Sequence, residues 1–385
     1  MRVLLVEPDY YTKYPPLGLM KLASYHRSRG DEVNYVRGVS DNRDFNPDII
    51  KITSLFTYAW RPVHRAIEFY HNLYPNAKME VGGIYASIMP ERLRSQYPFL
   101  YIHIGIFKPA ECYLPDYDIL KTVKKWSDWN SSILFTSRGC IRKCPFCIVP
   151  KLEGKIDSIA TSISDYIYPG HNKIILWDNN FFASPRWKEV INELQDIGLE
   201  VDFNQGLDAR LIDEEKARML ADLKIDIYRM AYDSSDEADA VRNAVKSLAN
   251  YGIRDRSILI YSIYNFFNNL DLSGDSPSEF LARLNDILEL KCVAYPMRFE
   301  PLDSLIKGQY ISPLWEEYQL EAIAKARRVI GYGGAFPPYE GLVNKFKYAK
   351  NFDDAFRLRL PRNETSNNFK NNATTIQIKN KENYF

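Results

Sequence analysis

Three cysteines lie within one short stretch of this chain, and their spacing points to metal chemistry. Residues 140–147 read CIRKCPFC, so three residues and then two separate Cys140, Cys144 and Cys147. Thiolates are soft ligands that suit iron–sulfur clusters and zinc. A [4Fe–4S] cluster held by only three cysteines keeps one iron free to bind a small molecule, as an open zinc site does in a hydrolase. The stretch therefore predicts a metal site with an open coordination position.

Two other kinds of metal site are weighed against this one. A zinc site needs a fourth ligand, for which Cys112, Cys292 or one of the five histidines is available. A ferredoxin-type electron carrier requires a fourth cysteine close by, usually followed by proline, and the sequence has none there. Three structural cysteines without a metal would leave their crowding on one stretch unexplained.

Composition bounds the class of protein. At 385 residues the chain is long enough for two domains, and 46% hydrophobic content supports a substantial core. With 50 basic and 49 acidic residues the net charge is +1, so no overall field attracts nucleic acid or a membrane. No apolar run approaches the ~20 residues of a membrane helix, and the first residues indicate a strand rather than a signal peptide. Five cysteines, three of them clustered, favour a reducing compartment, so we expect a cytoplasmic protein.

The first third of the chain alternates strand-like and helix-like segments. Strands are expected at residues 2–6, 33–36, 49–53, 78–81 and 101–104. Alternation of this kind predicts a doubly wound parallel sheet, which binds ligands beyond the carboxyl ends of its strands. Thr53 and Leu55 lie at the end of the third strand, and Gly82 and Gly83 at the end of the fourth, so these four are candidate ligand contacts.

A second series of strands begins just before the cysteines. Strand-like runs are expected at residues 133–136, 174–177, 201–204, 227–231, 258–263 and 293–297, with a helical stretch between each pair. Ser276 and Glu279 form a capping box that starts one of these helices. Right-handed crossovers of such units close into a partial (βα)6 barrel, since a full eightfold barrel would need two more units. The fold class is therefore α/β: a parallel sheet, then a partial barrel, then a helical C-terminal segment.

Polar residues follow the strands of this predicted barrel, where the reacting groups of parallel barrels sit. They are Asp178, Asn179 and Asn180 after the second strand, Asn204, Gln205 and Arg210 after the third, and Asp233 after the fourth. A carboxylate with two amides accepts hydrogen bonds from an ammonium group, and an arginine binds a carboxylate with two bonds. The plainer alternative is an Asn-rich turn after a strand.

The C-x3-C-x2-C pattern, with Phe146 before the last cysteine, resembles the cluster loop of the radical S-adenosylmethionine (radical SAM) superfamily. The resemblance spans roughly residues 130–300 and implies a [4Fe–4S] cluster on the three cysteines. It also implies that the free iron binds the amino and carboxylate groups of S-adenosylmethionine, and that Phe146 lies beside the adenine.

The same resemblance implies roles for the polar strand ends. The family segment that holds the amino group of S-adenosylmethionine is usually Gly-Gly-Glu, and residues 178–180 stand in its place as Asp-Asn-Asn. By the same analogy, the ribose hydroxyls and the methionine carboxylate are reached by Asn204, Gln205, Asp233 and Arg210. No residue is assigned as catalytic.

The first domain resembles the cobalamin-binding domain that precedes many radical SAM barrels. The resemblance rests on Thr53-Ser54-Leu55 at one strand end and Gly82-Gly83 at the next, over roughly residues 1–110. It implies that these residues line the pocket for the nucleotide tail of cobalamin. The histidine that supplies a lower cobalt ligand is missing, because residues 7–11 read EPDYY. A Rossmann-like domain that binds no cobalamin is the alternative.

The expected domain organisation has five segments. These are a Rossmann-like domain at 1–112, a linker at 113–130, the barrel at 131–300, a helical extension at 301–362 and a disordered tail at 363–385. The glycine- and aromatic-rich residues 331–339 are expected to pack against the open side of the barrel rather than to bind phosphate.

These patterns predict an enzyme that reductively cleaves S-adenosylmethionine to a 5′-deoxyadenosyl radical and functionalises a C–H bond. With cobalamin, methyl transfer is favoured; without it, rearrangement, epimerisation or cyclisation. A methylthiotransferase would need three further cysteines in the first domain, which has only Cys112. A zinc- or cluster-stabilised binding protein without turnover is the non-enzyme alternative. The expected partners are a flavodoxin- or ferredoxin-type electron donor and a small-molecule or peptide substrate, with no membrane and no nucleic acid indicated.

Overall fold

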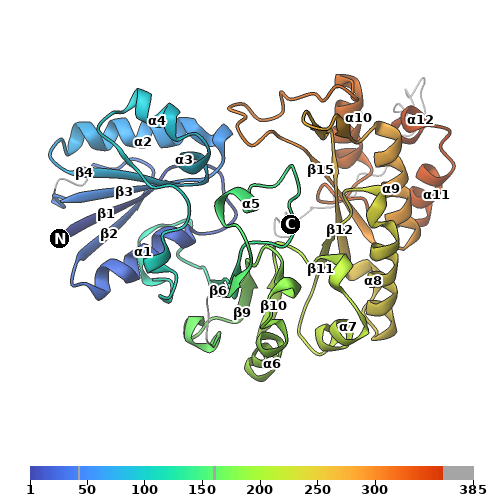
Figure 1. Cartoon of the computed structure of the whole chain (residues 1–385), viewed down its shortest axis with the longest axis horizontal. Helices are drawn as coiled ribbons and strands as arrows, with labels where there is room; N and C mark the ends of the chain where they lie inside the picture. The colour runs from blue at the N-terminus through green and yellow to red at the C-terminus, as the bar shows by residue number, and fades with distance from the viewer. Residues whose placement is uncertain (42–43, 159–161, 359–385) are drawn as a thin grey trace, which may run out of the picture.

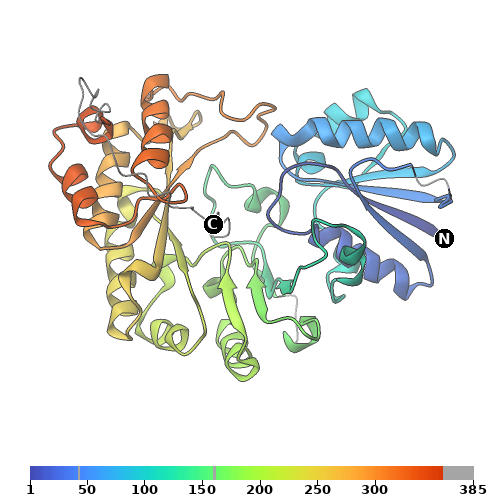
Figure 2. The ribbon, with the colours of Figure 1, turned by 180° about the vertical axis from the view of Figure 1, so that it is seen from behind.

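The computed structural model describes residues 1–41, 44–158 and 162–358. An N-terminal parallel sheet with its helices lies beside an arc of parallel strands (Figure 1), and the view from behind shows the cysteine loop between the two parts (Figure 2). The predicted fold class is confirmed: a parallel sheet, a partial barrel and C-terminal helices follow one another along the chain.

Five parallel strands form the N-terminal sheet in the order β2-β1-β3-β4-β5. The strands are β1 (Arg2–Glu7), β2 (Glu32–Arg37), β3 (Ile49–Ser54), β4 (Lys78–Gly83) and β5 (Tyr101–Ile102). The helices are α1 (Leu17–Ser28), α2 (Trp60–Leu73), α3 (Ile84–Ile88) and α4 (Pro90–Gln96). The strand order reverses between β1 and β3, which is where open sheets of this kind bind ligands.

Alternating side chains of β1 explain why helices cover both faces of this sheet. Val3 and Leu5 pack with Leu19 and Met20 of α1 on one face. Leu4 and Val6 belong to the core on the other face, which includes the apolar residues of α2. A strand buried on both sides needs no polar alternation, which accounts for its continuous apolar run.

The second part contains two three-stranded parallel sheets, in the orders β10-β9-β6 and β11-β12-β15. The strands are β6 (Ser131–Leu134), β9 (Lys173–Leu176), β10 (Glu200–Phe203), β11 (Tyr228–Ala231), β12 (Ile258–Tyr264) and β15 (Val293–Arg298). Bridges from Glu200 to Lys224 and from Leu207 to Met230 join β10 to β11. The six strands therefore form one arc, the predicted partial barrel.

Helices connect consecutive strands on the outside of the arc. They are α6 (Trp187–Ile197), α7 (Glu214–Ala221), α8 (Ala238–Asn250) and α9 (Pro277–Glu289), the last with the predicted capping box. The helical stretch expected between β6 and β9 is short in the described residues, which hold there α5 (Val149–Leu152) and one 3-10 turn. The cysteine loop takes up most of this connection.

Short strands add two small hairpins at the carboxyl ends of the barrel strands. Strands β7 (Ser137–Arg138) and β8 (Asp157–Ser158) pair antiparallel on either side of the cysteine loop. Strands β13 (Phe267–Asn268) and β14 (Ser273–Gly274) pair after β12.

The C-terminal segment covers the open edge of the arc. The backbone N–H of Phe336 donates to the carbonyl of Ala294 in β15 at 2.7 Å, and Ala294 donates back to Phe336 at 3.0 Å. This pairing confirms the packing role expected for residues 331–339. The helices are α10 (Glu317–Val329), α11 (Glu340–Lys347) and α12 (Phe352–Phe356). The expected tail at 363–385 lies outside the described residues. Among the residues that the structure describes, no helix is long and apolar enough to cross a membrane.

Candidate functional site

The cysteine loop leaves the barrel at the carboxyl end of β6 and is closed at its neck by tight backbone contacts. Gly139 has φ +80°, and a Cβ added there would lie 2.2 Å from the carbonyl oxygen of Lys155. Next to it, the backbone N–H of Cys140 donates to Gly154 at 3.1 Å. Only glycine fits this position, so the backbone conformation at which the cysteine loop begins is fixed.

All three cysteines of the loop are free and half-buried. Burial first, and then the charges of Cys147, Cys140 and Asp233, raise the pKa of Cys144 to about 11, against the opposing charge of Arg210. Among the described residues no group of three or more His, Cys, Asp or Glu is arranged to hold a metal ion, so the sulfurs are not preassembled as ligands. If all three cysteines of this loop ionise, their thiolates require a compensating cation, which an iron–sulfur cluster or zinc supplies.

Asp178 has a different role from the one predicted. It is buried, and its carboxylate accepts from the backbone N–H and hydroxyl of Thr136 at 3.0 and 2.6 Å and from those of Ser137 at 2.6 and 2.8 Å. Desolvation raises its pKa, and these four donors oppose that rise. The expectation that Asp178 accepts from a ligand ammonium is not supported, because its oxygens already bind the strand that leads to the cysteine loop.

The two neighbouring asparagines lie closer to the cysteines. The Asn179 amide donates to Glu153 at 2.7 Å. The Asn180 amide donates to the Sγ of Cys140 at 3.7 Å and to Asp208 at 3.1 Å. Asn180 is only 3% exposed, and its Oδ1 is buried without a hydrogen-bond partner. An unpartnered acceptor beside Cys140 is the feature of this strand end that calls for a donor from a ligand.

Asp208 is a site residue that the sequence analysis did not single out. It accepts from the guanidinium groups of Arg142 at 2.8 Å and Arg210 at 2.7 Å, in addition to the Asn180 amide. Burial alone would raise its pKa, but the two arginines outweigh that effect and lower it. Its signal in the sequence was its place five residues after the strand at 200–203, in a loop that also carries Asn204, Gln205 and Arg210.

Arg210 is not free to bind a ligand carboxylate in the way predicted. Its guanidinium donates to Asp208 and, at 2.7 Å, to Glu237. The structure does bring it close to the cysteines, since its charge acts on Cys144. Arg210 therefore neutralises the two carboxylates beside the cysteine loop, and a ligand would have to displace one of them.

Of the remaining predicted site residues, three contact other parts of the protein and one is exposed to solvent. The Asn204 amide donates to the hydroxyl of Tyr14, which comes from the loop after β1. Gln205 is exposed. Asp233 accepts from the backbone N–H of Ile263 at 2.8 Å, and burial raises its pKa to about 6. Phe146 packs edge-on against Phe266 after β12, with ring centroids 5.4 Å apart.

The predicted contacts in the N-terminal sheet have internal explanations. Gly83 has φ +98°, and an added Cβ would lie 2.1 Å from the carbonyl oxygen of Ser54. A Cβ on Gly82 would lie 3.6 Å from the Cβ of His103. Gly83 is therefore accounted for by the packing of neighbouring strands, whereas the structure has room for a Cβ at Gly82.

The two other residues predicted for the cobalamin tail show no unmet polar group. Leu55 is half-buried and packs on the core between the sheet and α2. Thr53 is half-buried and lies close enough to the phenol of Tyr10 to affect its pKa. These contacts neither require a corrinoid nor build a site for one, whereas the cysteines and the Asn180 oxygen fit a cluster and a ligand amine.

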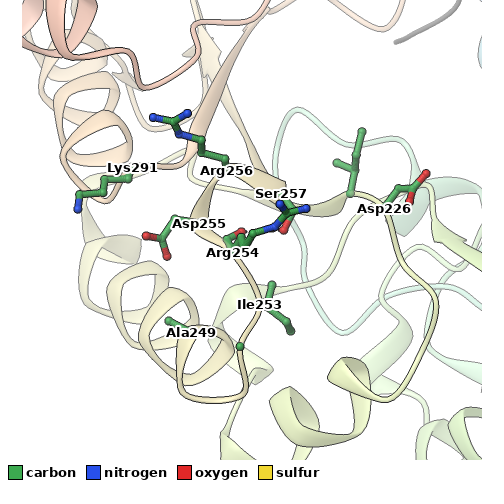
Figure 3. A pocket seen from close by; sticks show the side chains of 10 residues that line it. Asp226, Ala249, Ile253, Arg254, Asp255, Arg256, Ser257 and Lys291 are labelled. Atoms are coloured by element: carbon green, nitrogen blue, oxygen red, sulfur yellow. Dashed lines mark hydrogen bonds between the residues drawn. The ribbon is translucent and has the colours of Figure 1, made fainter.

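A pocket of about 670 Å³ lies at the other end of the barrel strands (Figure 3). It is lined by residues that include Arg254, Arg256 and Lys291. Figure 3 shows these three cationic side chains pointing in different directions, so they do not converge on one anion. The cysteine loop is therefore the better candidate site.

Comparison with known proteins identifies solved structures with a similar fold. No protein-family model matches the sequence, and neither does any curated protein. Among solved structures, the chain is similar to the radical S-adenosylmethionine methyltransferase TsrM from Kitasatospora setae, described with cobalamin and a [4Fe–4S] cluster bound: TM-score 0.61, 14% identity, covering 78% of this chain and 77% of that one. It also matches coproporphyrinogen III oxidase (HemN) from Escherichia coli, a radical SAM enzyme, with TM-score 0.37 and 16% identity over 61% of this chain and 62% of that one. The chain thus has the α/β fold of a radical SAM protein, with a parallel sheet ahead of the barrel.

Proposed function

We propose that the protein is a radical SAM enzyme whose [4Fe–4S] cluster is held by Cys140, Cys144 and Cys147. The observation that carries this proposal is the buried, unpartnered Oδ1 of Asn180 beside Cys140. It lies at the carboxyl ends of the barrel strands, where parallel barrels bind their substrates. Three free thiols and an unmet acceptor at one strand edge fit a cluster with a ligand amine next to it.

Each residue of the site has a role that its contacts support. Asn180 accepts from the amino group of S-adenosylmethionine, and its amide fixes the Cys140 sulfur. Asp178 holds the end of β6, so that the loop leaves the strand in one direction. Arg210 and Arg142 offset the negative charge of Asp208 beside the cluster. Phe146 and Phe266 give the ligand an apolar edge that excludes water.

A [4Fe–4S] cluster and S-adenosylmethionine bound here would supply the chemistry, which is one-electron reductive cleavage of a sulfur–carbon bond to methionine and a 5′-deoxyadenosyl radical able to abstract hydrogen from a substrate carbon. The residues of the chain hold the three cysteine sulfurs in place, orient the ligand amine and exclude water from the strand edge. We propose a flavodoxin- or ferredoxin-type protein as the electron donor and a small molecule or peptide as the substrate.

Anaerobic reconstitution with iron and sulfide tests this proposal. After reduction with dithionite in the presence of S-adenosylmethionine, 5′-deoxyadenosine is measured by chromatography. We expect deoxyadenosine from the reconstituted protein and none from protein loaded with zinc instead. Bound zinc with no cluster and no deoxyadenosine would favour a metal-stabilised binding protein and overturn the proposal.

Cobalamin-dependent methyl transfer is a second candidate. It is favoured by the fold likeness to TsrM, which was solved with cobalamin, and by the β2-β1-β3-β4-β5 order, which reverses at a ligand-binding switch point. The packing reason found for Gly83 weighs against it. Incubation with hydroxocobalamin followed by gel filtration decides between cobalamin-dependent methyl transfer and a reaction without cobalamin. A corrinoid that stays with the protein supports methyl transfer, and its loss leaves rearrangement, epimerisation or cyclisation.

A further inference from the structure

Four charged side chains connect helix α1 to the cysteine loop, and we call Lys21, Glu111, Arg138 and Glu153 the charge chain. Lys21 donates to the backbone carbonyl of Glu111 at 3.1 Å and to its carboxylate at 3.4 Å. Arg138 donates to Glu111 at 2.8 Å and to Glu153 at 3.2 Å. Each of the four residues thus contacts the next, and positive and negative charges alternate along the charge chain.

The charge chain is shielded from water. The exposed fraction of the side chains is 4% for Lys21, 14% for Glu153 and 15% for both Glu111 and Arg138. Burial lowers the pKa of Lys21. Burial opposes ionisation of Glu111 too, but Arg138 and Lys21 outweigh it and lower its pKa. Removing one member leaves a buried neighbouring charge with fewer partners, which is costly.

At one end of the charge chain, Arg138 and Glu153 lie on either side of the cysteine loop. Arg138 directly precedes Gly139, where the loop begins, and its guanidinium also lies over the ring of Phe135. Glu153 closes α5 at the far end, and its carboxylate accepts from the Gly139 N–H at 3.0 Å and from Asn179 at 2.7 Å. The two ends of the loop are therefore held together by the same carboxylate.

The other end of the charge chain belongs to the N-terminal sheet. Lys21 lies on α1, which packs on β1 and β2, and Glu111 follows the last strand of that sheet. Neither side chain belongs to the loop. The contacts connect the two parts of the molecule through side chains that are otherwise expensive to bury.

We propose that Lys21 and Glu111 are positioning residues of the cysteine loop, through which the N-terminal part of the protein sets the conformation of the three metal-binding cysteines. The consequence for a cluster rests on the proposed function, but the effect on the loop does not. The N-terminal sheet therefore contributes to the site even if it binds no cofactor of its own.

Hydrogen exchange on the metal-free protein tests the effect on the loop. In Lys21→Met and in Glu111→Gln we expect backbone amides of residues 139–153 to exchange about tenfold faster, because a charge-assisted hydrogen bond that held them is lost. The control is Glu91→Gln, which removes a carboxylate from an exposed ion pair with Arg94 and should leave the loop unchanged. Faster exchange confined to α1 would overturn the proposal. If Lys21→Met fails to fold, Glu111→Gln decides alone.

Iron retention tests the consequence for the cluster. After reconstitution, iron should pass to a chelator several-fold faster from Glu111→Gln than from wild type or Glu91→Gln. Equal rates would overturn the positioning role. A wild-type protein that takes up no iron would refute the proposed function instead, and a changed loop exchange in the variants would still support the coupling between α1 and the loop.

Discussion

The two parallel-strand edges of this protein look alike in sequence and differ in structure. Small and polar residues follow the strands in both places, and both edges were predicted to bind a cofactor. At the barrel edge, the Asn180 oxygen stays buried without a partner beside three free thiols. At the N-terminal edge, Gly83 makes room for the carbonyl of Ser54, and Gly82 lies against His103. Both edges hold unmet polar atoms, since His103 Nε2 just after β5 is also a buried atom without a hydrogen-bond partner. The barrel edge differs because its unmet acceptor lies beside a loop that carries three free thiols.

The largest effect is expected at the cysteine loop. Cys144→Ala should abolish both iron binding at full stoichiometry and the formation of 5′-deoxyadenosine, since two cysteines cannot hold a cluster with one open iron. Iron analysis and chromatography measure these. The matched control is Cys112→Ala, which removes an exposed thiol outside the loop and should change neither quantity. Deoxyadenosine made by Cys144→Ala at the wild-type rate would refute the cluster assignment.

Asn180 tests whether its unmet oxygen serves a ligand. Asn180→Leu keeps the volume but removes the acceptor, together with the amide that donates to Cys140 and Asp208. Affinity for S-adenosylmethionine should fall about tenfold to a hundredfold, as expected for a hydrogen bond to a charged group. Isothermal titration measures the affinity, with iron content as the check on the cluster. Asn172→Leu is the control, because Asn172 is exposed just before β9. Unchanged affinity in Asn180→Leu would mean that the oxygen has no ligand role.

The two glycines of β4 test the packing explanation at the N-terminal edge. Gly83→Ala should lower the free energy of unfolding by about 1–3 kcal/mol, because its φ and the Ser54 carbonyl both oppose a side chain. Gly82→Ala should change it by less than about 1 kcal/mol, since the added Cβ meets His103 at an ordinary contact distance. Urea unfolding measures both. A Gly82→Ala variant of normal stability that lost corrinoid binding would restore the ligand explanation.

The smallest effect is expected where the two edges meet. Tyr14 reaches from the loop after β1 to Asn204 at the end of β10, and its ring packs edge-on against Trp177 at 5.4 Å. Tyr14→Phe removes only the hydrogen bond, so stability should fall by about 0.5–1.5 kcal/mol. Thermal unfolding compared with the exposed Tyr11→Phe measures this. Equal stability of the two variants would show that the contact contributes nothing.

The sequence predicted the architecture well because strand periodicity and helix caps are local signals. Every strand of the sheet and barrel lies where an apolar run indicated it, and the Ser276–Glu279 capping box starts α9 as expected. The shortness of the helical stretch between β6 and β9 was not predicted, because a long cysteine loop and a helix can occupy the same length of chain.

The site was predicted only in part, since side-chain partners depend on contacts between distant segments. The three cysteines were predicted as metal ligands from their spacing alone, and the structure places them half-buried on one loop. The structure reassigned Asp178 to Thr136 and Ser137 and tied Arg210 to Asp208 and Glu237. The charge chain joins residues up to 90 positions apart, so no local pattern indicated it.

Electron paramagnetic resonance of the reduced protein, with and without S-adenosylmethionine, tests the central claim most directly. The account predicts the signal of a reduced [4Fe–4S] cluster and a clear change in that signal when S-adenosylmethionine binds at the open iron beside Asn180. Absence of a cluster signal, or a cluster signal that saturating S-adenosylmethionine leaves unchanged, would contradict the assignment of the barrel edge as the ligand site.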